Sequence, residues 1–167
     1  MALVIGLVLY LESQPDLEPW HTADLDAEFT SDDSAGTFAD YLALEDRLFN
    51  QLDELVYSRI SSEDKGLINR YNRGSLSDPG RWSPNWNRTF ELSTEAPRAG
   101  VLLLHGMSDS PYSLHSLGSR LNAEGLWIIG LRLPGHGTAP AGLVRIRWEH
   151  MDAAVRLAVR HLYDSRS

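Results

Sequence analysis

Two short, continuous apolar runs constrain the fold of this chain more than any other feature. Val101–Leu104 and Leu126–Leu133 have the length of strands, and a turn that contains glycine follows each of them. Such runs are typical of strands buried on both faces, as in parallel sheets. A stretch with the apolar spacing of a helix follows each turn. This strand–helix–strand–helix order predicts an α/β fold with a parallel sheet and right-handed crossovers.

Sequence signals also predict where the helices in the second half of the chain begin and end. Ser110 suits an N-cap and Pro111 the first helical position. The buried stripe of this helix is expected to comprise Leu114, Leu117 and Leu121. Gly125 is expected to end it. The spacing of the last stretch predicts a second helix from about Trp148 to Tyr163.

The middle of the chain predicts a long helix followed by a loop. Apolar residues recur every three or four positions over Thr37–Ile60, which indicates an amphipathic helix. Its other face carries acidic side chains that we expect to be solvated and to have no catalytic role: Asp40, Glu45, Asp46, Asp53 and Glu54. Asn69–Asn87 is rich in turn-forming residues and is expected to be a loop, and Arg88–Leu92 alternates as a strand does.

The first eleven residues, Met1–Leu11, are apolar almost without interruption. A bilayer span needs about 18 such residues, and the basic region and cleavage site of a signal peptide are absent. Two interpretations stay open: part of a membrane anchor, or a buried segment of the fold. The polar, acidic stretch Glu12–Asp33 resembles a linker that leaves a membrane. Localisation therefore stays open between membrane-anchored and cytoplasmic.

The length of 167 residues suits one domain or part of one. We divide it into an apolar start and acidic linker (1–35), a helix and loop extension (36–87), and an incomplete α/β core (88–167). The net charge of −8 works against nucleic acid as a partner, and the lack of cysteine excludes a thiol nucleophile. No metal or other cofactor is expected, because histidines without metal-ligand spacing are scattered along the chain: His21, His115, His150 and His161.

Two motifs carry a family resemblance. Val101–Leu114, with His105-Gly106 after the strand, resembles the α/β-hydrolase superfamily at the turn that follows its third strand. Arg132–Gly137, which reads Arg-Leu-Pro-Gly-His-Gly, is similar to the turn after the fourth strand in the monoacylglycerol-lipase and serine-aminopeptidase-like branch. The resemblance covers about residues 88–165. It implies the first part of a serine hydrolase core, of the lipase or esterase kind, with a peptidase as the nearest variant.

The resemblance also implies a role for the first turn. Acyl transfer builds negative charge on the carbonyl oxygen, and a backbone N–H must point at it. Carried over by position, this oxyanion-hole donor is the backbone N–H of Met107, presented by the turn of His105 and Gly106, and the Met107 side chain would line the acyl pocket. His136 is expected to be a packed loop histidine rather than a base. The substrate would be a small acyl ester or a lipid-like ester.

The nucleophile, the acid and the base of such an enzyme have no counterpart in this chain. The family carries its serine in Gly-x-Ser-x-Gly, and the two nearest stretches, Gly106–Ser110 and Gly74–Asp78, lack the closing glycine. Ser108 is a poor candidate, because Ser110 is better explained as an N-cap. We therefore expect a truncated serine hydrolase that is inactive alone, with Val101–Leu104 as an unpaired apolar sheet edge.

Two alternatives from other classes remain. A short natural chain could keep the scaffold without catalysis and act by binding or by completing the sheet of a partner. The chain could also be a membrane-proximal interaction protein that works through Met1–Leu11 and its acidic helix.

Overall fold

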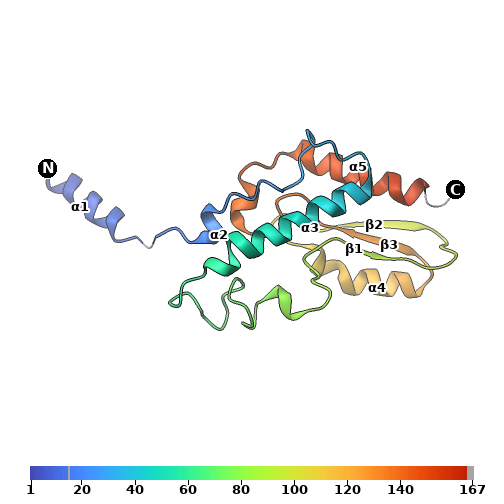
Figure 1. Cartoon of the computed structure of the whole chain (residues 1–167), viewed down its shortest axis with the longest axis horizontal. Coiled ribbons are helices and arrows are strands. Elements are labelled where there is room, and N and C mark those ends of the chain that lie inside the picture. The colour runs from blue at the N-terminus through green and yellow to red at the C-terminus, as the bar shows by residue number, and fades with distance from the viewer. Residues whose placement is uncertain (15, 165–167) are drawn as a thin grey trace.

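A three-stranded sheet lies at the centre of the fold, and all its strands come from the second half of the chain (Figure 1). The computed structural model describes residues 1–14 and 16–164. Its elements are α1 (Ala2–Glu12), α2 (Pro19–Thr22), α3 (Phe38–Leu55), β1 (Phe90–Leu92), β2 (Gly100–Leu104), α4 (His115–Ala123), β3 (Trp127–Leu131) and α5 (Trp148–Asp164). Short 3₁₀ turns lie at Tyr57–Arg59, Pro79–Arg81, Pro111–Leu114 and Pro140–Leu143.

The strand order is β1-β3-β2, and the sheet is mixed. β2 and β3 are parallel, with Leu102 opposite Ile129, as the strand–helix–strand pattern predicts. β1 is antiparallel to β3, with Phe90 opposite Gly130, so the prediction of a parallel sheet is wrong for this strand. The connection from β1 to β2 holds no helix. A parallel crossover needs a dozen or more residues, so this short connection cannot return the chain to the same end.

Helices cover both faces of the sheet. Trp127, Ile129 and Leu131 of β3 form a core cluster with side chains of α5 and α3 on one face. Gly118 of α4 faces Ile128 on the other. The predicted helix at 148–163 is confirmed as α5. The helix predicted over Thr37–Ile60 is confirmed over α3, and a capping box of Thr37 and Asp40 begins it.

β3 is buried along its whole length, whereas β2 is only partly buried. Leu104 is 46% exposed. The expectation that Val101–Leu104 is buried on both faces is therefore wrong, because β2 pairs on one side only among the described strands. Its outer side is the unpaired edge that the sequence predicts.

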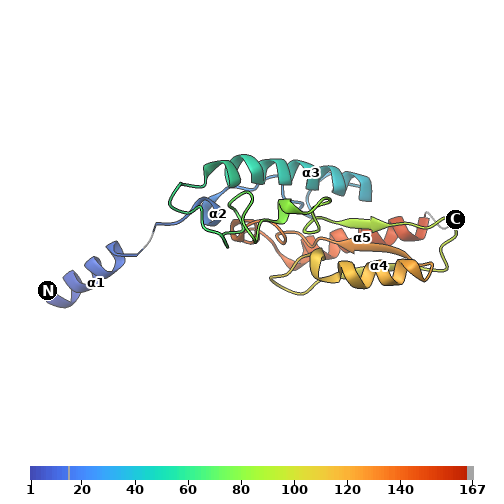
Figure 2. The same ribbon diagram turned by 90° about the horizontal axis from the view of Figure 1, so that it is seen from below.

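Most of Met1–Leu11 lies in α1, which begins at Ala2 and projects away from the rest of the fold in both views (Figures 1 and 2). Its large apolar side chains are exposed, with Leu3 88% and Tyr10 62% accessible. The interpretation of this segment as a buried part of the fold is therefore wrong. Among residues 1–14 and 16–164, no helix has the length and hydropathy that crossing a membrane requires.

Candidate active site

The turns after β2 and β3 lie at the same end of the sheet, because the two strands are parallel. Ligands of open α/β sheets bind beyond the carboxyl ends of such strands. The first turn holds His105, Gly106 and Met107, and the second holds His136. The structure thus brings the two motifs together, and the rings of His105 and His136 lie 5.2 Å apart between centroids.

Both ring nitrogens of His105 are occupied. The backbone N–H of Leu133 donates to His105 Nε2 at 3.0 Å, and His105 Nδ1 lies 2.9 Å from the carbonyl oxygen of Gly106. Nε2 must therefore be the acceptor and Nδ1 the protonated nitrogen. Burial lowers the pKa of His105, which favours this neutral form. His105 thus links the two turns and has no free nitrogen to act as a base.

The backbone N–H of Met107 makes no hydrogen bond to any residue in the described part of the chain. An oxyanion-hole donor must be unpaired in this way before substrate binds. The side chain of Met107 is 73% exposed. That it lines an acyl pocket stays a prediction.

Ser108 has a φ of 59°, a left-handed conformation that is rare outside glycine. Its hydroxyl donates to the carbonyl oxygen of Met107 at 2.6 Å. Backbone strain of this kind costs about 1–3 kcal/mol and clusters at functional sites. The hydroxyl bonds within its own turn rather than to a histidine, so Ser108 is not arranged as a nucleophile.

The second turn is anchored by Arg132, whose side chain is buried. Its guanidinium donates to both carboxylate oxygens of Glu28, at 2.8 and 3.0 Å, and to Glu45 Oε2 at 3.0 Å. Burial is the largest single influence and opposes the charge, but Glu28, Tyr41 and Glu45 together outweigh it and hold the pKa of Arg132 well above its usual value. Tyr41 adds a bond from its hydroxyl to the carbonyl oxygen of Arg132 at 2.5 Å.

Glu45 corrects the expectation that the acidic side chains of α3 are all solvated. It is 3% exposed and also accepts bonds from the backbone N–H and the hydroxyl of Thr89, at 2.9 and 2.8 Å. Helical spacing places Glu45 on the buried face, four residues after Tyr41. Arg132 inside the apolar run Leu126–Leu133 is a second sequence signal for a buried acidic residue, since a buried charge needs acidic partners.

No sequence signal distinguishes Glu28 from the other acidic residues of the stretch Glu12–Asp33. Its carboxylate accepts the backbone N–H of Gly135 at 2.8 Å in addition to the Arg132 bonds. Glu28 and Glu45 come from the N-terminal half of the chain. These contacts therefore fix that half directly onto the second turn.

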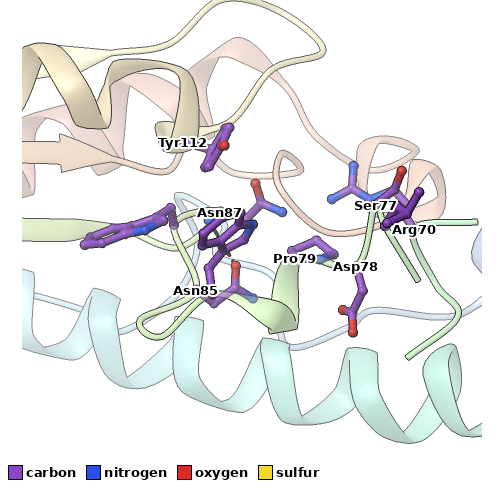
Figure 3. A pocket seen from close by; sticks show the side chains of 10 residues that line it. Arg70, Ser77, Asp78, Pro79, Asn85, Asn87 and Tyr112 are labelled. Carbon is purple, nitrogen blue, oxygen red and sulfur yellow. Dashed lines mark hydrogen bonds between the residues drawn. The ribbon is translucent and has the colours of Figure 1, made fainter. Parts of the chain in front are cut away.

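Two cavities lie beside the loop 69–87. The tryptophan cavity, of about 350 Å³, is lined by Arg70, Leu76, Ser77, Asp78, Pro79, Trp82, Asn85, Trp86, Asn87 and Tyr112. Figure 3 shows Arg70 and Ser77 at one end of it and Asn85, Asn87 and Tyr112 at the other. The histidine cavity, of about 380 Å³, is lined by Arg70, Tyr71, Ser108, Asp109, Ser110, Gly135, His136, Gly137, Thr138, Ala139, Pro140 and Leu143.

The loop 69–87 lines most of the tryptophan cavity, contributes Arg70 and Tyr71 to the histidine cavity, and is held against the two turns. The hydroxyl of Ser110 donates to Asn87 Oδ1 at 2.6 Å. Gly137 has a φ of 74°, and a Cβ atom there would lie 2.5 Å from the carbonyl oxygen of Asn87. Only glycine permits this close approach. The sequence predicts a loop for this segment, but no sequence signal places it at the site.

The remaining histidines lie apart from this region or make structural contacts. His150 Nδ1 accepts the backbone N–H of Ser31 at 2.9 Å, and His161 contacts Glu91 at 3.2 Å. His115 lies against the ring of Trp86. No group of three or more metal-ligating side chains occurs among the described residues.

No protein-family model matches the chain, and no curated protein matches it. One similar solved structure comes from the work on LipS and LipT, two metagenome-derived lipolytic enzymes. The two chains are 29% identical over a region that covers 47% of this chain and 31% of that one, with a TM-score of 0.44. This chain thus spans about a third of the length of that relative. A TM-score of this size does not establish a shared fold.

Proposed function

We propose that residues 88–164 form the first part of a serine hydrolase core that cleaves carboxylic esters, and that the backbone N–H of Met107 is one of its two oxyanion-hole donors. The observation that carries this proposal is the turn after β2. Its Met107 N–H is unpaired in the described structure, its Ser108 is in a left-handed conformation, and His105 ties it to the neighbouring turn.

In the proposed mechanism, this chain supplies one oxyanion-hole donor, and residues after Ser167 supply the nucleophile, the acid and the base. A serine hydroxyl gives its proton to a histidine base and attacks the ester carbonyl, and the carbonyl oxygen becomes an oxyanion. The Met107 N–H donates to that oxyanion as its charge develops, and the N–H after the nucleophile supplies the second bond. No Gly-x-Ser-x-Gly occurs within the 167 residues. We propose that the nucleophile, acid and base follow Ser167 in the complete protein.

Arg132 has a positioning role in this scheme. It joins Glu28 and Glu45 to the turn after β3, and His105 joins that turn to Met107 by way of Gly106. The oxyanion donor therefore depends on contacts that begin in the N-terminal half. We propose that this half belongs to the catalytic unit and is no detachable extension.

The test uses the product of the complete reading frame and hydrolysis of p-nitrophenyl butyrate. Met107→Ala keeps the backbone N–H and should hydrolyse the ester at close to the wild-type rate. Met107→Pro removes the N–H and should lower kcat by about 10²–10³-fold, the usual effect of losing one oxyanion donor. Circular dichroism checks that both variants fold. Equal rates for the two variants would refute the role of the Met107 N–H.

The same assay addresses the branch and the non-catalytic alternative. We propose the monoacylglycerol-lipase and serine-aminopeptidase-like branch on the strength of the Arg132–Gly137 motif. An esterase of this branch should prefer p-nitrophenyl esters to p-nitroanilides of the same acyl group, and a peptidase should cleave the anilides. No turnover of either substrate by the complete protein would favour a non-catalytic binding protein.

We also propose that α1 associates with lipid, which is the membrane-proximal function. Nine large apolar residues of α1 and the preceding Met1 are 46–99% exposed: Met1, Leu3, Val4, Ile5, Leu7, Val8, Leu9, Tyr10 and Leu11. An apolar helix that is exposed all round suits a lipid environment better than a one-sided groove.

Flotation with phosphatidylcholine vesicles tests this second proposal. The wild-type chain should float with the vesicles, and the double variant Ile5→Lys/Val8→Lys should stay in the dense fraction. Leu67→Lys places a charge at another exposed apolar site and serves as the control. Flotation of the double variant with the wild type would refute lipid binding through α1.

A further inference from the structure

Two exposed aromatic rings belong to the lining of the tryptophan cavity. Trp82 is 56% exposed and Tyr112 is 53% exposed, so both rings offer much of their surface to a ligand. Tryptophan is well buried on average. An exposed tryptophan in a cavity is therefore a candidate ligand contact.

The turn that precedes Trp82 is held in place before any ligand binds. The carboxylate of Asp78 accepts the backbone N–H groups of Gly74 and Gly80, both at 2.8 Å. This contact caps the 3₁₀ turn Pro79–Arg81, and the backbone N–H of Trp82 donates to the carbonyl oxygen of Pro79 at 3.3 Å. Asp78 thus has a structural role, and the position of Trp82 is fixed by its backbone.

Two amide groups of the lining are oriented with their NH₂ groups free. Asn85 Oδ1 accepts the backbone N–H of Asn87 at 3.0 Å, and Asn87 Oδ1 accepts the hydroxyl of Ser110 at 2.6 Å. Neither Nδ2 atom has a hydrogen-bond partner among residues 1–14 and 16–164, and both are accessible to solvent. Figure 3 shows both amides near Tyr112. A ligand therefore meets oriented hydrogen-bond donors beside exposed rings.

The charges around the cavity cancel. Arg70 and Asp78 are the charged residues of its lining, and they have opposite signs. Arg73 pairs with Asp78 and also with Asp53. These two arginines and two aspartates leave no net charge to attract an ion, which favours a neutral ligand.

We infer that the tryptophan cavity binds a pyranose ring. The C–H groups on one face of such a ring pack on an aromatic side chain, and the hydroxyl oxygens at its edge accept from Asn85 and Asn87. A fatty acyl chain has nothing that accepts from these amides, and a linear polyol has no flat apolar face. The cavity volume of about 350 Å³ lies in the range of small-ligand sites.

Ser110 and Tyr112 connect this cavity to the first turn. Ser110 follows Met107 by three residues and bonds to Asn87, and Tyr112 lines the cavity itself. A pyranose carries hydroxyls and no carboxyl group, so in an ester it is the alcohol part. The substrate class is then an acylated sugar. This last step rests on the proposed ester hydrolysis, whereas sugar binding does not.

Isothermal titration calorimetry of the 167-residue chain tests the cavity without any need for turnover. The probes are the methyl glycosides of glucopyranose, galactopyranose and mannopyranose, which differ in the orientation of their hydroxyls. At least one should bind with a Kd of about 1 mM, as expected for a ligand of this size. Sorbitol and 1-hexanol should bind at least about tenfold more weakly, because sorbitol lacks the flat face and 1-hexanol most of the hydroxyls.

Two results would overturn the inference. One is no binding of any of the three glycosides. The other is binding of sorbitol or 1-hexanol as tight as that of the best glycoside, since the cavity would then recognise polyols or apolar chains in general.

Variants locate the bound sugar. Trp82→Ala removes an exposed ring and should weaken binding at least about tenfold. Asn85→Asp keeps the oxygen that accepts from Asn87 but loses the Nδ2 donor, and it should weaken binding about 3–10-fold. Trp148→Ala removes an exposed tryptophan of α5 outside the lining and should leave binding unchanged. Circular dichroism checks that each variant folds, and wild-type binding by either cavity variant would refute the site.

The complete protein tests the link to the substrate. Methyl 6-O-butyrylglucopyranoside and ethyl butyrate share an acyl group and differ in the alcohol. Trp82→Ala should raise KM for the sugar ester at least about tenfold more than KM for ethyl butyrate, because only the sugar loses a binding contact. An equal change for both esters would contradict the assignment of the sugar as the alcohol part.

The two proposals fail separately. Sugar binding with no ester hydrolysis by the complete protein would refute the proposed function and leave the sugar site intact. Ester hydrolysis with no sugar binding would refute the sugar site alone.

Discussion

The backbone N–H of Leu133 donates a hydrogen bond to His105 Nε2 at 3.0 Å. His105 ends the run that forms β2, and Leu133 follows β3, so this bond joins the turns at the carboxyl ends of two parallel strands. The side chain of His105 thus has a structural role. It sets the position of the next two residues, and the N–H of Met107 is one of them.

His105 predicts a specific pH dependence of folding. Burial lowers its pKa from 6.5, so the unfolded chain binds this proton more readily than the folded chain. The contribution of His105 to the free energy of unfolding is fully present above about pH 6.5. It is lost as the pH falls below that value. His105→Gln can accept the Leu133 bond but cannot titrate. Urea unfolding between pH 8 and 5.5 should show a smaller loss of stability for this variant, and parallel curves would contradict the account.

Arg132 predicts a large effect on stability. Arg132→Met leaves Glu28 and Glu45 as buried, unpaired carboxylates, which should lower the free energy of unfolding by about 3–5 kcal/mol. Adding Glu28→Gln and Glu45→Gln should restore part of it, because the buried charges are then gone. Arg156→Met removes an exposed ion pair and should match the wild type in urea. A mild effect of Arg132→Met would show that α3 is not anchored through this arginine.

Gly130 predicts a steric effect inside the sheet. A Cβ atom at this position would lie 2.1 Å from Phe90 Cε1, so Gly130→Ala should lower the free energy of unfolding by about 1–3 kcal/mol. Gly66→Ala has nothing within 4 Å and is the control. Wild-type stability of Gly130→Ala would contradict the pairing of Phe90 with Gly130.

Leu104 predicts the behaviour of the sheet edge. A charged residue on an unpaired strand blocks edge-to-edge association. Leu104→Lys should therefore slow aggregation of the chain in light scattering. Leu117→Lys changes a side chain of similar exposure on α4, 49% against 46%, and should slow it less. If both variants slow aggregation equally, general charge is the cause and not the edge of β2.

The sequence predicts the elements with strong local signals. Periodic apolar spacing identified α5 almost to its ends, and the turn residues Ser110 and Pro111 marked the start of the segment that contains α4. The antiparallel direction of β1 depends on a connection whose path no local pattern encodes. The placement of the loop 69–87 beside the two turns depends on contacts such as the one between Ser110 and Asn87.

In the candidate site too, local features could be predicted from the sequence and contacts between distant segments could not. The sequence located the two turns, because their glycines and histidines follow strands. It could not show that His105 Nε2 accepts from the backbone N–H of Leu133, or that Arg70 lines one cavity with Thr138 and His136, since these residues come from distant segments. Glu45 was misassigned because the acidic residues of α3 were treated as one face, although helical spacing separates Glu45 from the others.

We propose that this chain carries the oxyanion half of a serine hydrolase whose nucleophile lies further along. The most direct measurement is the source DNA for about 500 bases beyond the codon for Ser167, enough for the rest of one ordinary α/β domain. The account predicts a Gly-x-Ser-x-Gly in this interval, in the same frame or a shifted one, after a further apolar strand. A stop codon with no such motif in any frame would contradict it.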